Sequence, residues 1–136
     1  MRYLLDTNTV SEPTRKRPDP KAAAWLHAVD QAALYVSVLA LGEIENGITK
    51  LARRDPEAAS TLSVWAQVIR LDFSDRIIAI DMEIAATWGR ISAERSIPVI
   101  DGLLAATALV HGMTLVSRNV RDFSDTGVTV LNPWEA

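Results

Sequence analysis

Two patterns of apolar and polar residues alternate along the chain. One consists of short apolar runs bounded by polar or turn-forming residues, which predict buried β-strands. The other has apolar residues three and four positions apart, which predicts amphipathic helices with one face on the core. The predicted strands lie at residues 3–5, 34–38, 77–80 and 114–116, with an edge strand within 128–131.

The helices are marked by their first residues as well as by their apolar faces. Asp19 is a favourable N-cap, and Pro20 after it suits the first helical position. Ser37 and Asp81 are further candidate N-caps. The predicted helices are a short one after the first strand, then one from Pro20, one at 39–54, one at 57–70, one after Asp81 and one from Asp101 to Gly112, with a loop at 13–18.

Strands that alternate with helices predict an α/β fold, a parallel sheet covered by helices on both faces. The expected architecture is a three-layer α/β/α sandwich with a central parallel sheet of four to five strands. The chain has 136 residues, which fits one domain with a substantial core, and it shows no repeat or linker. We therefore expect residues 1–136 to form a single domain.

Composition narrows the possible chemistry. The chain has no cysteine, which excludes disulfides, thiolate metal sites and cysteine nucleophiles. His27 and His111 are far apart and neither lies in a ligand-spaced motif. A metal site with nitrogen ligands is therefore not expected, whereas oxygen-ligated Mg²⁺ or Mn²⁺ remains open.

Hydropathy and charge indicate the compartment and the partners. The start of the chain does not resemble a signal peptide, and the apolar stretch at 32–41 is too short to span a bilayer, so we expect a cytoplasmic protein with no membrane partner. A net charge of −3 argues against nucleic-acid binding through bulk positive charge. It does not exclude a nuclease with an acidic metal site, and basic clusters occur at 15–17, at 50–54, and at Arg118 with Arg121.

Four acids, from distant parts of the chain, follow a strand or begin a helix. Asp6 follows the first strand directly, at the end of a parallel sheet where ligands bind, although capping the next helix explains it equally well. Glu43 lies off the apolar face of its helix, and spacing alone does not separate it from Glu45. Asp122 follows the fourth strand and, taken alone, is a loop acid.

Asp101 carries more information because it shares a helical face with Leu104, Ala105 and Ala108. A carboxylate at the head of a buried stripe needs a partner, since burying an unpaired charge is costly. Capping its own helix is one way to meet that need. A bound cation is the other.

Taken together, the four acids indicate metal binding. Two bare carboxylates about 4 Å apart repel by about 4 kcal/mol at an effective dielectric constant near 20. Two divalent cations would neutralise such a set. This arrangement is suited to two-metal cleavage of a phosphodiester, in which one ion activates water and the other stabilises the leaving oxygen.

Four sequence blocks also resemble a known family. They are Leu4-Leu5-Asp6-Thr7-Asn8, residues 37–43, Ile100-Asp101 and Ser117-Arg118-Asn119-Val120-Arg121-Asp122-Phe123. In order and spacing they are similar to the signature blocks of PIN domains. The match is closest to VapC toxins of bacterial type II toxin–antitoxin modules, in the FitB-like branch with an Asn-Pro-Trp tail.

The resemblance implies a PIN fold and an Mg²⁺- or Mn²⁺-dependent ribonuclease that a cognate antitoxin inhibits and that usually forms a homodimer, or a higher hetero-oligomer with the antitoxin. By position, Asp6 and Asp101 would be the main metal ligands, and Glu43 and Asp122 would complete the catalytic set. The supporting residues would be Asn8, Ser117 and Asn119, with Ser117 acting through hydrogen bonds. Many PIN domains have an aspartate at the position of Asn119, so the second metal is less firmly implied than the first.

Alternatives remain at this stage. Arg118 and Arg121 are candidates for holding RNA phosphates, but they are equally well explained as solubilising surface residues. A strand ending in Asp-x-Asp is also the mark of haloacid-dehalogenase-type phosphatases, although here the second position is Asn8, which cannot serve as a general acid. The remaining alternative is a PIN module with weak catalysis that acts mainly through protein and DNA-bound antitoxin complexes.

Overall fold

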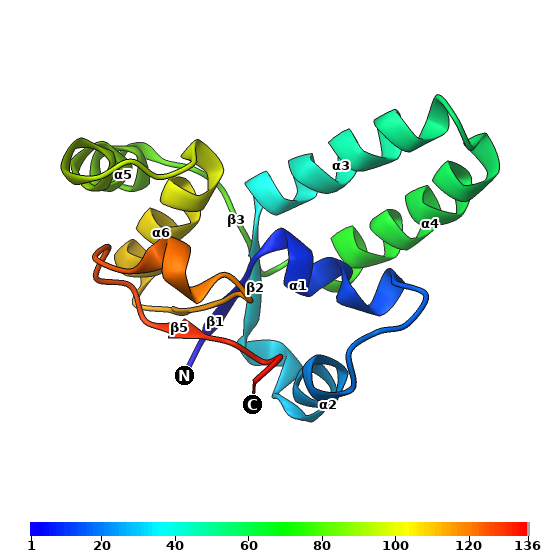
Figure 1. Ribbon diagram of the computed structural model, residues 1–136, viewed down its shortest axis with the longest axis horizontal. Helices are drawn as coiled ribbons and strands as arrows, with labels where there is room; N and C mark the ends of the chain where they lie inside the picture. Colours follow the sequence, from blue (N-terminus) through cyan, green and yellow to red (C-terminus); the bar gives the residue numbers. More distant parts are fainter. Residues whose placement is uncertain (136) are drawn as a thin grey trace.

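The computed structural model describes residues 1–135, and within this range five strands form one sheet in the order β3-β2-β1-β4-β5 (Figure 1). Every neighbouring pair of strands is parallel, as the alternation of strands and helices predicted. The strands are β1 (Tyr3–Leu5), β2 (Leu34–Ser37), β3 (Ile77–Ile78), β4 (Thr114–Val116) and β5 (Val130–Leu131). The predicted strands are confirmed, but β2, β3 and β5 are shorter than expected.

The helices also follow the sequence pattern closely. They are α1 (Thr7–Ser11), α2 (Pro20–Ala28), α3 (Val38–Ala52), α4 (Pro56–Asp72), α5 (Met82–Glu94) and α6 (Val99–His111). Short 3-10 turns are η1 (Glu12–Thr14), η2 (Gln31–Ala33) and η3 (Val120–Phe123). The loop predicted at 13–18 therefore begins inside η1.

The start of α6 corrects one expectation. The helix begins at Val99 rather than at Asp101, and its N-cap is Pro98, which has no side-chain capping bond. The Gly102 N–H already donates to the Pro98 carbonyl at 2.9 Å, so Asp101 lies inside the first turn. Capping by Asp101 was therefore wrong, and its carboxylate is left for another partner.

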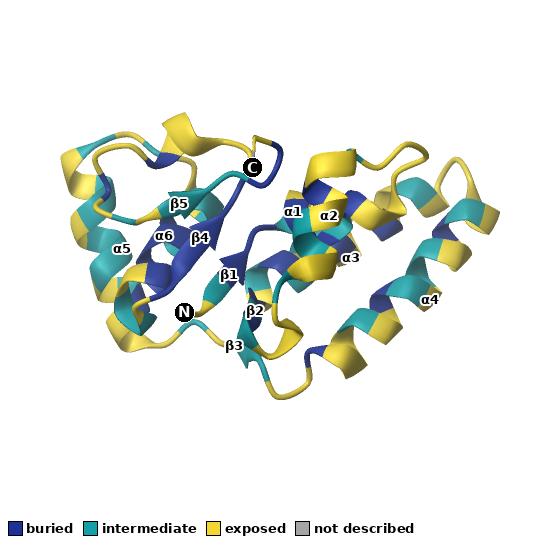
Figure 2. Cartoon of the chain, turned by 90° about the horizontal axis from the view of Figure 1, so that it is seen from below, coloured by how far each residue is buried: buried dark blue, intermediate teal, exposed yellow. Residues whose placement is uncertain are grey.

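Successive residues of β1 face opposite sides of the sheet and separate two cores. Leu5 packs with Val36, Ile44 and other residues of the side that carries α1 to α4. Leu4 packs with Leu104 and its neighbours on the side of α5 and α6. The two groups of helices lie on opposite faces of the buried central strands, which confirms the three-layer sandwich (Figure 2).

Two helices extend beyond the sheet. α3 and α4 pack against each other as a hairpin that projects from the body of the molecule (Figure 1). The Asp55 side chain accepts from the Ala58 N–H at 3.1 Å and caps α4 at the turn of this hairpin. In the described part of the chain, every helix is too short or too polar to cross a membrane.

Candidate active site

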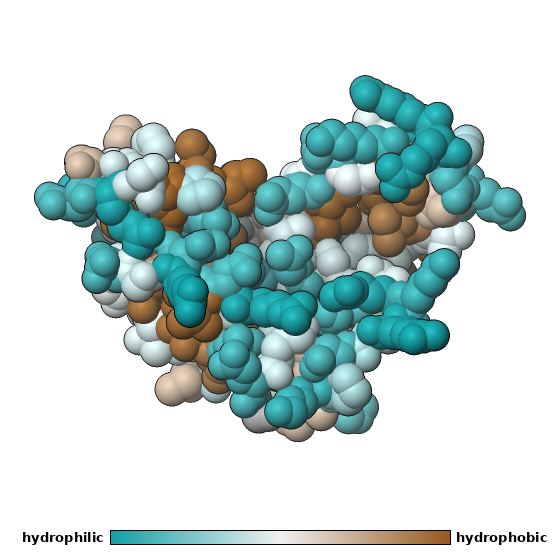
Figure 3. All heavy atoms as spheres, viewed as in Figure 1, coloured by the Kyte–Doolittle hydropathy of each residue, from teal (hydrophilic) through white to brown (hydrophobic). Residues whose placement is uncertain are grey.

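The register of the sheet brings the ends of three strands to the same level. Leu5 at the end of β1 is paired with Val36 of β2 on one side and with Val116 of β4 on the other. Helix α1 starts just beyond β1, and α3 starts where β2 ends. Segments far apart in the sequence therefore meet at one edge of the sheet, next to a dip in the surface between the α5–α6 side and the α3–α4 hairpin (Figure 3).

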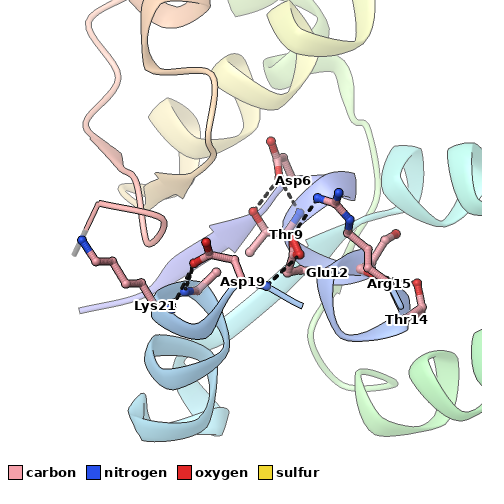
Figure 4. Close-up of polar contacts among 9 residues, drawn as sticks. Asp6, Thr9, Glu12, Thr14, Arg15, Asp19 and Lys21 are labelled. Atoms are coloured by element: carbon pink, nitrogen blue, oxygen red, sulfur yellow. Dashed lines mark hydrogen bonds and ion pairs between the residues drawn. The ribbon is translucent and has the colours of Figure 1, made fainter. Parts of the chain in front are cut away.

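Asp6 occupies the centre of this edge. It is 7% exposed and is the N-cap of α1, so the predicted capping role is confirmed. Its Oδ1 accepts from the Thr9 N–H at 2.9 Å and from the Thr9 hydroxyl at 2.6 Å (Figure 4). Both bonds use one oxygen, and Oδ2 has no hydrogen-bond donor among residues 1–135. A helix cap thus leaves half of this carboxylate available for another ligand.

Thr9 also joins Asp6 to the neighbouring strand. Its hydroxyl oxygen is fully buried and lies 3.1 Å from the Val116 carbonyl as well as 2.6 Å from Asp6. Since a hydroxyl donates one proton, the shorter contact with the carboxylate is the stronger bond. Thr9 therefore fixes the position of Asp6 relative to the end of β4.

The structure distinguishes the two glutamates of α3 that sequence spacing did not separate. The Thr7 hydroxyl donates a hydrogen bond to the Glu43 carboxylate, which ties α3 to α1 next to Asp6. Glu45 instead pairs with Arg70 of α4 at 3.3 Å, with both side chains about half exposed. Glu43 faces the edge of the sheet where Asp6 lies, and Glu45 faces the hairpin.

Asp101 receives the electrostatic influence of the other three acids. Burial, together with the negative charges of Asp122, Asp6 and Glu43, raises the pKa of the Asp101 carboxyl above its ordinary value. The acids of four separate segments are therefore close enough for their charges to act on one another. A bound cation would oppose this effect by favouring the ionised carboxylate.

The four acids nevertheless do not form a finished ligand set. Among residues 1–135, no three Asp, Glu or His side chains stand close enough together to hold one ion. The raised pKa of Asp101 is consistent with this spacing. Charges influence one another over distances several ångströms longer than a metal–oxygen bond. Asp6 and Glu43 are each held by a threonine hydroxyl in this structure.

The segment after β4 carries the remaining predicted site residues. Ser117 is fully buried, and its hydroxyl oxygen accepts from the Asn119 N–H at 3.0 Å, which fixes the start of the turn. Asn119, Arg121 and Asp122 are exposed and line one shallow hollow. Ser117 thus holds the turn that carries Asn119 and Asp122, and its support of the catalytic set stays a prediction.

Asn8 lies away from this turn and shares a second hollow with Arg118, which also lines the first. Both line a space of about 360 Å³ together with residues of η1 and the C-terminal tail. Asn8 is exposed on α1, with a predicted supporting role that no contact here bears on. The structure therefore separates the predicted supporting residues into two places.

Three buried or partly buried polar side chains near the site were given no role in the sequence analysis. Thr7 and Thr9 each hold an acid, and Glu12 is a carboxylate only 1% exposed. Thr9 could have been inferred from its place three residues after the Asp6 cap, where a hydroxyl reaches the capping side chain. Thr7 gave no signal, because its partner is 36 positions away in the sequence.

Comparisons with known proteins identify the family of this fold. The sequence model of the PIN domain matches residues 3–128. Toxin FitB of Neisseria gonorrhoeae is 31% identical, over 96% of this chain and 97% of FitB. The plasmid stability protein StbB of Pseudomonas syringae pv. tomato is 28% identical, over 98% of this chain and 99% of its own.

A solved structure has the same fold. The crystal structure of FitAcB from Neisseria gonorrhoeae contains a chain that superposes with a TM-score of 0.91 and 31% identity, covering 98% of this chain and 99% of that one. The resemblance stated from the four sequence blocks is confirmed. With a family match over nearly its whole length and a parallel sheet that gathers acids at one edge, the chain belongs to the PIN domain family.

Proposed function

We propose that this protein is a metal-dependent endoribonuclease, the toxin of a type II toxin–antitoxin module that a cognate antitoxin inhibits. Toxin FitB and the VapC ribonuclease Y4jK of Sinorhizobium fredii support this activity, the latter with 26% identity over 97% of both chains. A structure described as FitAB bound to an IR36 DNA fragment supports the regulatory half, with 33% identity and a TM-score of 0.89. The match to the PIN domain over residues 3–128 excludes the haloacid-dehalogenase-type phosphatase.

The observation that carries the proposal is the electrostatic environment of Asp101. Its pKa is raised by burial and by the charges of three acids that come from three other segments. Nucleases of the PIN family generally depend on divalent metal ions. Carboxylate oxygens are the preferred ligands of Mg²⁺ and Mn²⁺, so the donor set fits these ions.

In this proposal Asp6 and Asp101 are the main metal ligands, and Glu43 and Asp122 complete the set. When bound, the ions supply Lewis acidity that activates the attacking water and stabilises the leaving oxygen. The role of the protein is to hold the carboxylates ready. Thr9 holds Asp6 through two hydrogen bonds, and Thr7 holds Glu43 through one.

The RNA is bound and oriented by residues around these acids. We propose that Arg118 and Arg121 contact its phosphates, and that Ser117 supports the turn on which Asn119 and Asp122 lie. Water attacks phosphorus, the bond from phosphorus to the 3′ oxygen breaks, and that oxygen takes up a proton. The products are a 5′-phosphate and a 3′-hydroxyl.

The activity is tested with purified protein and labelled single-stranded RNA. Cleavage is expected with Mg²⁺ or Mn²⁺, is abolished by EDTA, and is abolished in the double variant Asp6→Asn, Asp101→Asn. The product ends are identified by their response to phosphatase and ligase. Cleavage that survives EDTA, or survives the double substitution, would refute the proposal.

Regulation and assembly are tested separately. We propose that the chain, as one domain of residues 1–136, forms a homodimer and binds a small antitoxin. Co-expression with the adjacent gene is expected to give a co-purifying complex in which RNA cleavage is suppressed. Light scattering during size-exclusion chromatography gives the mass of the free protein, and a monomer that does not bind the neighbouring gene product would contradict the regulatory half.

A second candidate function is a PIN module that binds its antitoxin without effective catalysis. The spacing of the acids bears on it, since no three of them in the described range are close enough to hold one ion, whereas Mg²⁺ is usually held by one or two carboxylates together with waters. It predicts normal antitoxin binding together with no cleavage of RNA at any concentration of Mg²⁺ or Mn²⁺. The cleavage assay therefore separates the two candidates.

A further inference from the structure

Trp134, on the tail that follows β5, lies next to arginines from two distant parts of the chain. The Arg118 guanidinium lies over its ring, 5.7 Å from the ring centroid. Arg15 and Arg17 come from the segment between η1 and α2. Two hollows, of about 360 Å³ and 400 Å³, both have Arg15, Arg118 and Trp134 in their walls, and Arg17 lines the second. Positive charge is therefore concentrated here on a chain whose net charge is −3.

Arg15 is held in place by a buried acid. Glu12 is 1% exposed, and its Oε1 lies 3.3 Å from Nη1 of Arg15 (Figure 4). A buried carboxylate needs a partner, so this pairing orients the arginine. The Arg15 side chain is still 61% exposed, which leaves donors of its guanidinium facing solvent.

The acids in these walls are already engaged by the protein. Glu12 pairs with Arg15, and Asp19 caps α2 by accepting from the backbone N–H groups of Lys21 and Ala22, both at 3.0 Å. The three arginines are therefore exposed to solvent. The charges of the two nearby carboxylates are partly neutralised by their own partners. Arginine is suited to phosphate because its planar guanidinium can donate two parallel hydrogen bonds.

The first hollow also adjoins the candidate active site. Asn8 lines it, and Asn8 is two positions after Asp6 on the same short helix. RNA is a polyanion, and it must approach a site that contains four carboxylates. A cationic surface next to that site would offset the repulsion and hold the strand close to the acids.

We propose that Arg15, Arg17 and Arg118, gathered around Trp134, form a phosphate-binding subsite for single-stranded RNA on one side of the scissile bond. The subsite rests on the proposed nuclease function and deepens it. It gives the RNA a path from the acids, past Asn8, to the C-terminal tail. Trp134 is a positioning residue that holds the Arg118 guanidinium.

The test measures RNA binding without cleavage. The affinity of the full-length protein for a short fluorescein-labelled single-stranded RNA is followed by anisotropy in EDTA, over a series of salt concentrations. The double variant Arg17→Gln, Arg118→Gln is expected to bind about tenfold more weakly, and the slope of log K against log salt should become shallower by roughly 1.4, about 0.7 per lost phosphate contact. The matched control Arg53→Gln, Arg54→Gln removes the same charge at the turn of the α3–α4 hairpin and is expected to keep the wild-type slope.

Conservative variants distinguish a loss of phosphate contacts from a loss of folding. Arg118→Lys keeps the charge and should keep the salt slope while losing part of the affinity, because a lysine lacks the planar fork. Trp134→Phe should retain binding, whereas Trp134→Leu should weaken it about as much as Arg118→Gln. Melting temperatures of all variants are measured alongside, so that loss of binding in a folded protein is recognised.

The outcomes distinguish this subsite from the proposed function. An unchanged salt slope in the Arg17, Arg118 variant overturns the subsite even if the wild type cleaves RNA. Loss of antitoxin binding with unchanged RNA affinity also overturns it, because the surface would then serve a protein. If the wild type does not cleave RNA but the arginine variants lose RNA binding as expected, the nuclease proposal fails, and the three arginines stand as an RNA-binding surface without a scissile bond beside it.

Discussion

A side chain at Gly102 would collide with Trp88: a Cβ there would lie 2.9 Å from Cδ1 and 3.1 Å from Nε1 of the indole. Gly102 follows Asp101 on α6, and Trp88 belongs to α5. The close approach of these two helices therefore fixes the turn that carries Asp101. The position of an acid in the candidate site depends on a glycine that has no chemistry of its own.

We expect Gly102→Ala to destabilise the protein. Alanine gains about 1 kcal/mol of helix propensity over glycine, but overpacking costs about 1–3 kcal/mol, so a net loss of roughly 1 kcal/mol in unfolding free energy is expected. Urea denaturation measures the change. The control is Gly89→Ala on α5, where a Cβ meets nothing within 4 Å and a gain of about 0.5–1 kcal/mol is expected. Equal effects of the two substitutions would contradict the close packing.

Glu43 and Glu45 should differ in their effect on cleavage. Glu43→Gln removes a carboxylate whose charge acts on Asp101, and it is expected to lower the rate of RNA cleavage by roughly 10–100-fold. Glu45→Gln loses an exposed pair with Arg70, which is worth about 0–1 kcal/mol of stability, and should leave the rate unchanged. Single-turnover cleavage in saturating Mg²⁺ compares them. If Glu45→Gln lowered the cleavage rate more than Glu43→Gln, Glu45 and not Glu43 would belong to the site.

Thr9→Val tests the support of Asp6. Valine keeps the shape of the side chain but removes the hydroxyl that lies 2.6 Å from the carboxylate, and it leaves the Val116 carbonyl without that contact. A loss of about 1–3 kcal/mol in unfolding free energy is expected, since the site is fully buried. Mg²⁺-dependent cleavage should require a higher metal concentration. An Mg²⁺ requirement equal to that of the wild type would show that Thr9 does not hold Asp6 for the metal.

Asp101→Asn should stabilise the metal-free protein at neutral pH. The pKa of Asp101 is raised on folding, so protonation of this carboxyl favours the folded state. This contribution to the unfolding free energy is fully present at pH values below the ordinary pKa and is lost as the pH rises through the raised pKa. Above that window the asparagine variant should melt at a higher temperature than the wild type in EDTA, and the difference should shrink as the pH falls.

Addition of Mg²⁺ should make the wild type melt at a higher temperature than the Asp101→Asn variant. At an Mg²⁺ concentration about 100 times its dissociation constant, binding adds about 2.7 kcal/mol to the stability of the wild type. The asparagine variant, with one ligand fewer, should gain less. A wild type whose melting temperature does not respond to Mg²⁺ or Mn²⁺ would contradict the proposed ligand role of Asp101.

Much of the fold follows from local patterns in the sequence. The apolar run before Asp6 and the capping residues Asp19, Ser37 and Asp81 predicted elements that the structure contains. These signals are local, because strand burial and helix capping depend on neighbouring residues. The start of α6 was predicted at Asp101 because aspartate is a favourable N-cap residue. In the structure the N-cap is Pro98 and the helix begins at Val99.

The supporting contacts could not be predicted from the sequence, because they join distant positions. Glu43 was chosen over Glu45 by family resemblance, and the Thr7 hydroxyl that binds Glu43 became visible only in three dimensions. The same holds for Arg15 and Arg118, which line one hollow although about a hundred positions separate them. Local pattern predicted the elements, and the order of the strands decided which side chains meet.

A crystal of the full chain soaked in Mn²⁺ shows where the ion binds through its anomalous scattering. We expect a peak at metal–oxygen bonding distance, roughly 2.0–2.5 Å, from carboxylate oxygens of both Asp6 and Asp101, with Glu43 or Asp122 rotated towards it. The same soak of the Asp6→Asn, Asp101→Asn variant should give no peak there. A wild-type crystal in saturating Mn²⁺ with no density between Asp6 and Asp101 would contradict the metal-dependent nuclease.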